Sequence, residues 1–177
     1  MDTIPDNSPL AQDVVRALSQ QRFMLAVAES CTGGLIGATI TSVAGSSACF
    51  AGGFIVYANE MKQRAIGVSA MTLEQHGAVS RQCAIEMANG ALEGARADIA
   101  VAVTGIAGPD GGTETKPVGT VWIGLARHGK LTSARHFIFP GDRQSVRVLT
   151  VQTVLQWILA LVCEKSPANL EYEHPTS

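Results

Sequence analysis

Two short stretches of uninterrupted apolar residues constrain the fold of this chain more than any other feature. They are residues 23–28 (FMLAVA) and 99–104 (IAVAVT). Runs of this length without polar alternation are typical of strands buried on both faces, as in a parallel sheet covered by helices on each side. Helical spacing of apolar residues precedes and follows both runs. The sequence therefore predicts a three-layer α/β/α domain with a mostly parallel sheet.

Periodicity and turn residues predict the other elements. Helices are expected over 8–20, 35–43, 58–67, 72–77, 80–95 and 142–163, and strands over 53–57, 118–126 and 131–139. The last two strands flank the turn 127–130 (RHGK), which indicates an antiparallel hairpin added to the parallel sheet. Residues expected to cap helix N-termini are Ser8, Ser30, Ser80 and Asp142, with a capping box from Thr72 to Gln75.

The last predicted helix carries two apolar stripes. One contains Val146, Leu149, Val154, Trp157, Ile158 and Leu161, and the other contains Val148, Val151, Leu155, Leu159 and Val162. A helix that is apolar on two faces must bury both of them. One face is expected to pack on the sheet, and the other on a second subunit, so a homodimer or larger homo-oligomer through this helix is predicted.

Composition limits the class of protein. The chain has 177 residues, 46% of them hydrophobic and 16% charged, with a net charge of −2, which excludes global disorder. We expect one domain over 8–165 between polar tails at 1–7 and 166–177. The basic residues are scattered, so nucleic acid is an improbable partner. No apolar run reaches 18 residues and the N-terminus lacks signal-peptide features, so we expect no membrane association and a cytoplasmic location.

The four cysteines give no sign of a metal site or a disulfide framework. Cys31, Cys49, Cys83 and Cys163 include no C-x-x-C pair, and no histidine stands at zinc-ligand spacing from them. Free thiols are the expectation, and neither a metal nor an organic cofactor is predicted.

Three loops leave the carboxyl ends of predicted strands, where open α/β sheets bind ligands. The first, 29–34 (ESCTGG), places Ser30 beside backbone amides that can hold an anion or an oxyanion. The second places Tyr57 and Lys62 five residues apart, and a desolvated lysine can activate a serine. Simpler interpretations stay open: Ser30 as a helix cap, Cys31 as a packing residue, and Lys62 as a solvated surface lysine.

The third loop, 105–116 (GIAGPDGGTETK), is rich in glycine but matches neither a P-loop nor a dinucleotide fingerprint. Its backbone amides can form a wall around a small polar ligand. Lys116, Arg143 and Arg147 are candidates to bind a phosphate, and each is equally interpretable as a solvated surface residue.

Several motifs, in one order along the chain, resemble the CinA C-terminal domain, the nicotinamide-nucleotide amidase family. They are residues 28–34 (AESCTGG), 45–47 (GSS), 53–57 (GFIVY), Asn59 with Lys62, 67–68 (GV), 77–80 (GAVS), 104–109 (TGIAGP) and 116–119 (KPVG). The resemblance covers about residues 8 to 163.

This resemblance implies a three-layer α/β/α hydrolase that converts nicotinamide mononucleotide into nicotinic acid mononucleotide and ammonia. It also implies a Ser/Lys/Tyr catalytic set, which carries over to Ser30, Lys62 and Tyr57, and no cofactor. Candidate oxyanion and substrate contacts are Cys31, Thr32, Gly33, Asn59, Thr104, Gly105, Ala107, Gly108 and Arg143. Two alternatives remain: a non-catalytic nucleotide-binding module linked to competence or DNA damage, and an amidase for another carboxamide.

Overall fold

The computed structural model describes residues 6–163, and its centre is one five-stranded sheet in the order β2-β1-β3-β4-β5. The strands are β1 (Leu25–Glu29), β2 (Phe50–Ile55), β3 (Ile99–Gly105), β4 (Thr120–Arg127) and β5 (Ser133–Ile138). β2, β1 and β3 run parallel, and β4 and β5 pair antiparallel beyond β3. The predicted parallel sheet with an antiparallel hairpin is confirmed.

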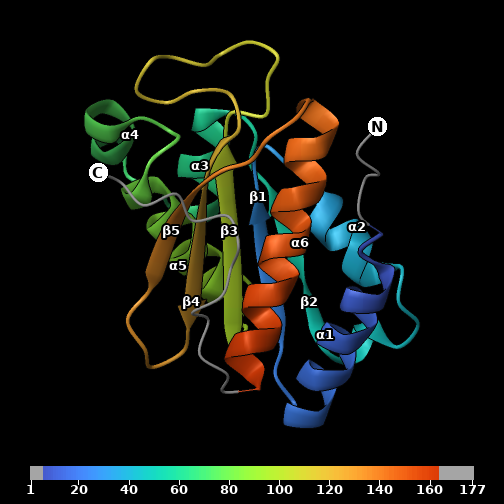
Figure 1. Ribbon diagram of the computed structural model, residues 1–177. Helices are drawn as coiled ribbons and strands as arrows, with labels where there is room; N and C mark the ends of the chain where they lie inside the picture. Colours follow the sequence, from blue (N-terminus) through green and yellow to red (C-terminus); the bar gives the residue numbers. More distant parts are fainter. Residues whose placement is uncertain (1–5, 164–177) are drawn as a thin grey trace.

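Helices cover both faces of the sheet (Figure 1). They are α1 (Ser8–Gln21), α2 (Leu35–Thr41), α3 (Asn59–Ile66), α4 (Ala70–His76), α5 (Arg81–Ala95) and α6 (Arg143–Val162), with a 3-10 turn at Ser46–Ala48. α1, α2 and α6 share one hydrophobic core with the sheet, and α5 and the end of α3 share the other. The predicted three-layer arrangement is therefore confirmed.

Residue size differs between the two sheet faces. Val27 and Val101 point into the core beneath α1 and α6, whereas Ala26 and Ala100 point towards α5. Gly124 continues the small face on β4, where a Cβ atom would lie 2.3 Å from the Ala84 carbonyl oxygen of α5. Small residues on this face thus let α5 approach the sheet closely. Large side chains there would prevent such an approach.

α6 is buried on most of its surface within the domain. Val148, Val151 and Leu155, from the second of its two apolar stripes, are buried, and α1 packs against α6. Part of the second stripe is therefore covered within the same chain. Among the described residues, α6 is also the one helix long and apolar enough to span a membrane, yet 61% of that stretch is buried in the protein. Oligomerisation stays a prediction.

Two of the predicted caps are present. Ser80 Oγ accepts from the Cys83 amide at the start of α5, and Asp142 Oδ1 accepts from the Ser145 amide at the start of α6. Each side chain satisfies an amide that lacks a partner within its helix. The predicted helix bounds there are correct to within one residue.

Two other predicted caps are wrong. Ser8 is the first residue of α1 rather than its cap, and its amide donates to the Asp6 carboxylate. α4 begins two residues before Thr72, where Ser69 accepts from the Met71 amide. The Thr72 hydroxyl instead donates to Glu86 of α5, a partner distant in sequence.

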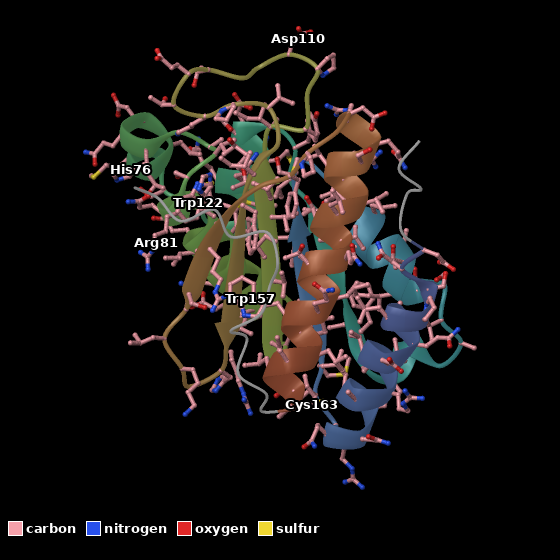
Figure 2. The ribbon with its side chains drawn as sticks, in the orientation of Figure 1. His76, Arg81, Asp110, Trp122, Trp157 and Cys163 are labelled. Atoms are coloured by element: carbon pink, nitrogen blue, oxygen red, sulfur yellow. The ribbon has the colours of Figure 1, made fainter. Side chains whose placement is uncertain are left out.

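β2 also begins earlier than predicted, at Phe50, and ends at Ile55 instead of residue 57. It is an edge strand with alternating exposure, so it lacks a long apolar run. Tyr57 therefore lies on the loop beyond β2. At the carboxyl ends of the parallel strands, the loop after β3 projects outward from the sheet, with Asp110 near its tip (Figure 2).

Of the predicted tails, residues 1–5 and 164–177 lie outside the described residues. Asp6 and Asn7 belong to the folded domain, since Asn7 donates to the Val148 carbonyl of α6.

Candidate active site

Ser30 and Lys62 meet beneath the carboxyl end of β1. Lys62 Nζ lies 3.1 Å from Ser30 Oγ and 3.0 Å from the Tyr57 carbonyl oxygen. Ser30 follows β1 directly, and Lys62 stands on α3, which packs against α5 on one face of the sheet. The chain runs from β1 through β2 to α3 and so places two residues that are 32 positions apart in contact.

Lys62 is a buried lysine, with 1% of its surface exposed, and Ser30 is 8% exposed. Burial lowers the pKa of the Lys62 amine, because desolvation disfavours the charged form. A neutral amine has two hydrogens and one lone pair. One N–H can stay bonded to the Tyr57 carbonyl while the lone pair accepts the Ser30 hydroxyl proton, so the geometry suits a general base.

Glu29, the last residue of β1, occupies the start of α2. Its Oε2 accepts from the Gly34 and Ile36 amides, both at 3.0 Å, and its Oε1 accepts from the Gly37 amide at 2.8 Å. The expectation that Ser30 caps this helix is wrong, because α2 begins only at Leu35 and the Glu29 carboxylate satisfies its first amides.

The turn between Ser30 and α2 holds the remaining amides. The Gly33 amide donates to the Ser30 carbonyl, and the Leu35 amide donates to the Thr32 carbonyl. Within the described residues, no oxygen accepts from the Cys31 or Thr32 amides, and both approach the Cys31 sulfur, which is a weak acceptor. These two N–H groups, next to Ser30 Oγ in the chain, are available for an oxyanion.

Tyr57 contributes its carbonyl to Lys62 but directs its hydroxyl elsewhere. The hydroxyl accepts from Arg143 Nη2 at 3.1 Å, and Arg143 Nη1 donates to the Gly108 carbonyl at 2.8 Å. The Tyr57 side chain is 60% exposed. Arg143 therefore connects the loop after β2 with the loop after β3. The direct contact between Ser30 and Lys62 leaves no need for a phenol relay between them.

The other two cations proposed for phosphate have protein partners. Arg147 donates from Nε and Nη2 to the Thr32 carbonyl at 3.3 and 2.9 Å. Lys116 Nζ donates to the His76 and Val79 carbonyls at 3.1 and 2.8 Å. Both therefore position backbone segments around the site in this structure.

Thr104 lies beside Ser30 in the sheet. β1 and β3 pair Glu29 with Val103, and the Ser30 amide continues this register by donating to the Val103 carbonyl. The Thr104 hydroxyl donates to the Ala78 carbonyl at 2.8 Å. Thr104 is therefore near the nucleophile, with its hydroxyl hydrogen already used.

The remaining candidates differ in exposure. Asn59 and Gly33 are exposed near the site, whereas the Ala107 side chain is buried in the core beneath α6. Gly105 is closely packed, since a Cβ there would lie 2.7 Å from the Thr120 carbonyl oxygen. Ala107 and Gly105 can therefore offer only backbone groups to a ligand.

The Cys31 thiol is a poor nucleophile here. Burial, reinforced by the nearby Glu29 charge, raises its pKa to about 12. Burial likewise raises the pKa of Cys83, which lies near Lys62, to about 11. Thiols attack as thiolates, so Ser30 is the better-placed nucleophile. The proximity of Cys83 to Lys62 was missed in the sequence, which offers no signal for it.

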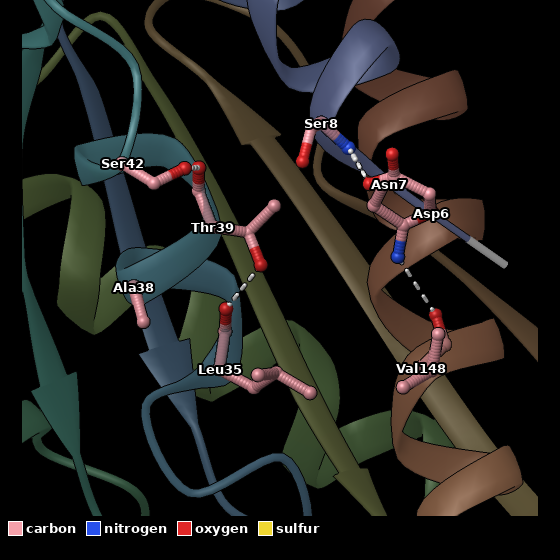
Figure 3. A pocket seen from close by; sticks show the side chains of 8 residues that line it. All are labelled: Asp6, Asn7, Ser8, Leu35, Ala38, Thr39, Ser42 and Val148. Carbon is pink, nitrogen blue, oxygen red and sulfur yellow. Dashed lines mark hydrogen bonds between the residues drawn. The ribbon is translucent and has the colours of Figure 1, made fainter. Parts of the chain in front are cut away.

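A separate pocket of about 340 Å³ lies between the start of α1, α2 and the first turns of α6 (Figure 3). Its lining includes Asn7, Leu35 and Val148 but neither Ser30 nor Lys62. Among residues 6–163, no group of three His, Cys, Asp or Glu side chains is arranged to hold a metal ion.

Comparison with protein families places this geometry in a known group. The model of the CinA C-terminal domain matches residues 7–162. The chain belongs to the CinA C-terminal domain family. The resemblance predicted from the motifs is confirmed, and the match spans nearly all of the described residues.

Relatives of this CinA-family chain carry an enzyme name. The chain is 51% identical over 152 residues to the nicotinamide-nucleotide amidohydrolase PncC of Enterobacter agglomerans, covering 83% of this chain and 92% of the relative. It is 50% identical over 147 residues to the protein of the same name from Escherichia coli K12, covering 83% and 89%.

Solved structures confirm the CinA-like fold. The competence/damage-inducible protein CihA from Agrobacterium tumefaciens is 42% identical and superposes with a TM-score of 0.86, covering 91% of this chain and 99% of that one. The α/β fold predicted for the chain is therefore shared with experimental structures of the family.

Proposed function

We propose that this protein hydrolyses the carboxamide of nicotinamide mononucleotide, producing nicotinic acid mononucleotide and ammonia. Two similar proteins named nicotinamide-nucleotide amidohydrolase, each covered for about nine-tenths of its length, support this substrate. The observation that carries the chemistry is the 3.1 Å contact between Lys62 Nζ and Ser30 Oγ. A buried amine beside a serine hydroxyl is suited to nucleophilic acyl transfer.

In the first half of the reaction, Ser30 Oγ attacks the carboxamide carbon while Lys62 Nζ takes the hydroxyl proton. The carbonyl oxygen becomes an oxyanion, which the Cys31 and Thr32 amides stabilise. An amide donor of this kind contributes about 10²–10³-fold in rate. The Lys62 ammonium then gives its proton to the amide nitrogen, the C–N bond breaks, and ammonia leaves an ester on Ser30.

In the second half, Lys62 accepts a proton from water, and the resulting hydroxide attacks the ester carbon. The bond to Ser30 Oγ breaks, and Ser30 recovers its proton from Lys62. The Tyr57 carbonyl keeps one Lys62 N–H occupied throughout, which holds the Lys62 nitrogen beside Ser30 Oγ in both halves. No metal or organic cofactor takes part in these steps.

The exposed groups around this pair are assigned to the substrate. Arg143, with Tyr57, stands at the entrance between two loops, where a guanidinium with further N–H groups suits a phosphate or ribose. Asn59 and the backbone of residues 105–108 complete the candidate contacts. We further propose a cytoplasmic location, because the four free cysteines Cys31, Cys49, Cys83 and Cys163 suit a reducing compartment.

The test is an ammonia assay with the purified protein and three carboxamides: nicotinamide, its riboside and its mononucleotide. Ammonia from the mononucleotide at a kcat/KM far above the other two supports the proposal. Preference for another carboxamide would indicate an amidase of different specificity. Binding of the mononucleotide without ammonia release would identify a binding module and refute the proposed hydrolysis.

A further inference from the structure

The turn that carries Ser30 is fixed from two sides by ionic side chains. Glu29 accepts three backbone amides at the start of α2, and Arg147 of α6 donates twice to the Thr32 carbonyl. Glu29 is 1% exposed. Neither side chain contacts Ser30 Oγ or Lys62 Nζ in the structure, so neither belongs to the reacting pair.

Glu29 decides which amides remain available to the substrate. It occupies the amides of Gly34, Ile36 and Gly37, which would otherwise make the start of α2 an anion site. The Cys31 and Thr32 amides are left for the oxyanion.

Arg147 fixes the plane of the peptide group after Thr32. Two donors from one guanidinium restrain a carbonyl more tightly than a single bond would, and Arg147 Nη1 is itself held by Gln144. Rotation of that peptide would move the Gly33 amide, which donates to the Ser30 carbonyl. Arg147 thereby connects the turn to the rigid start of α6.

We propose that Glu29 and Arg147 are positioning residues that hold residues 30–34 in the backbone arrangement that aims Ser30 at Lys62 and presents the Cys31 and Thr32 amides. This inference rests on the proposed hydrolysis. It also assigns Arg147 a role different from phosphate binding, which the sequence alone left open.

The experiment compares steady-state kinetics of wild type, Glu29→Gln, Arg147→Ala and Arg147→Lys with the mononucleotide, at a temperature where all are folded. In Glu29→Gln, either orientation of the amide turns an NH₂ group towards a backbone N–H. We expect kcat to fall about 10²-fold with KM within about threefold, because misplacement by about 1 Å costs this much. Arg147→Ala should lose kcat similarly, and Arg147→Lys should recover part of it.

The matched control is Asp98→Asn. The Asp98 carboxylate accepts a hydrogen bond from the Met24 amide at 2.8 Å. This contact lies at the amino ends of β1 and β3, whereas Ser30 follows the carboxyl end of β1. Asp98 undergoes the same carboxylate-to-amide change, and its kcat should stay at the wild-type value. Thermal melting of each variant separates loss of folding from loss of positioning.

Each outcome decides the inference. Wild type without activity refutes the proposed function rather than the positioning role. With active wild type, Glu29→Gln within twofold of its kcat overturns the role of Glu29. If Glu29→Gln does not fold, Arg147→Ala decides. An unchanged kcat in Arg147→Ala overturns the positioning role. A KM raised for the mononucleotide but not for the riboside also overturns it, and indicates that Arg147 binds the phosphate.

Discussion

Replacing Gly90 with alanine tests the packing that brings Lys62 to Ser30. Gly90 lies on α5 opposite the end of α3. A Cβ atom there would be 1.8 Å from the Ile66 carbonyl oxygen and 2.7 Å from its carbonyl carbon. Ordinary contacts begin at 3.4 Å, so α3 and α5 would have to separate by about 1.6 Å, the difference between that distance and the first.

The expected cost follows from two opposing effects. Alanine is favoured over glycine within a helix by about 1 kcal/mol. Overpacking against backbone costs about 3 kcal/mol, at the upper end of the usual range, since neither helix backbone can yield without moving. The net loss of about 2 kcal/mol lowers the melting temperature by about 4–8 °C in a protein of this size. Displacement of α3 also carries Lys62 away, which lowers kcat about 10²-fold.

Thermal unfolding followed by circular dichroism, with the ammonia assay below the transition, measures both effects. Gly94→Ala is the control one turn along α5, because its Cβ would meet only the Phe54 ring tip at 3.0 Å. That ring can move by a few tenths of an ångström, so little change is expected. A Gly90→Ala protein as stable and active as Gly94→Ala would refute the α3–α5 contact described here.

Four further predictions concern the pH dependence of catalysis and of stability, thiol labelling, and helix capping. kcat/KM should rise with pH through the lowered pKa of Lys62, because the neutral amine is the base, and a rate that falls over this range would contradict the assignment. Because burial lowers the pKa of Lys62, the protein releases a proton from this amine when it folds. The free energy of unfolding should therefore increase with pH between the folded and unfolded pKa values of Lys62. In a native thiol-labelling assay only the exposed Cys163, at the end of α6 (Figure 2), should react rapidly, and fast labelling of Cys31 would show that its environment is misdescribed. Asp142→Ala should cost about 1 kcal/mol in chemical denaturation through loss of the α6 cap, and an unchanged midpoint would exclude that cap.

Elements governed by local rules could be predicted from the sequence. The cores of β1 and β3 were evident from uninterrupted apolar runs, and Ser80 and Asp142 cap their helices because a cap acts over three residues. β2 was placed about three residues late, since an edge strand alternates and contains glycine, so its apolar signal is weak.

Errors arose where a distant partner changes the local choice. Serine is a common N-cap residue, yet at this helix the carboxylate of Glu29 accepts the hydrogen bond from the Gly37 amide instead of Ser30 acting as the cap. Thr72 had a capping pattern, but Glu86 of α5 accepts its hydroxyl hydrogen. The second stripe of α6 correctly predicted burial, while the covering partner, α1, could be identified only from the fold.

The candidate site shows the same division. The motif positions predicted that Ser30, Lys62 and Tyr57 would lie together at the carboxyl ends of the parallel strands, where such sheets bind ligands. The direction of each group was not predictable: Tyr57 binds Lys62 through its carbonyl, and Arg147 binds backbone. A periodic pattern specifies faces of helices and strands, but hydrogen-bond direction in loops depends on contacts between separate elements.

The most direct test of the Ser30–Lys62 pair is the kcat of ammonia release by Ser30→Ala and Lys62→Ala, with Cys31→Ala as the control. Removal of a positioned base costs about 10²–10⁴-fold, and loss of the nucleophile should reduce kcat at least as much. Both variants should keep the wild-type circular dichroism spectrum, and Cys31→Ala should retain near-normal turnover. Near-normal turnover in either Ser30→Ala or Lys62→Ala, or loss of activity only in Cys31→Ala, would contradict the mechanism.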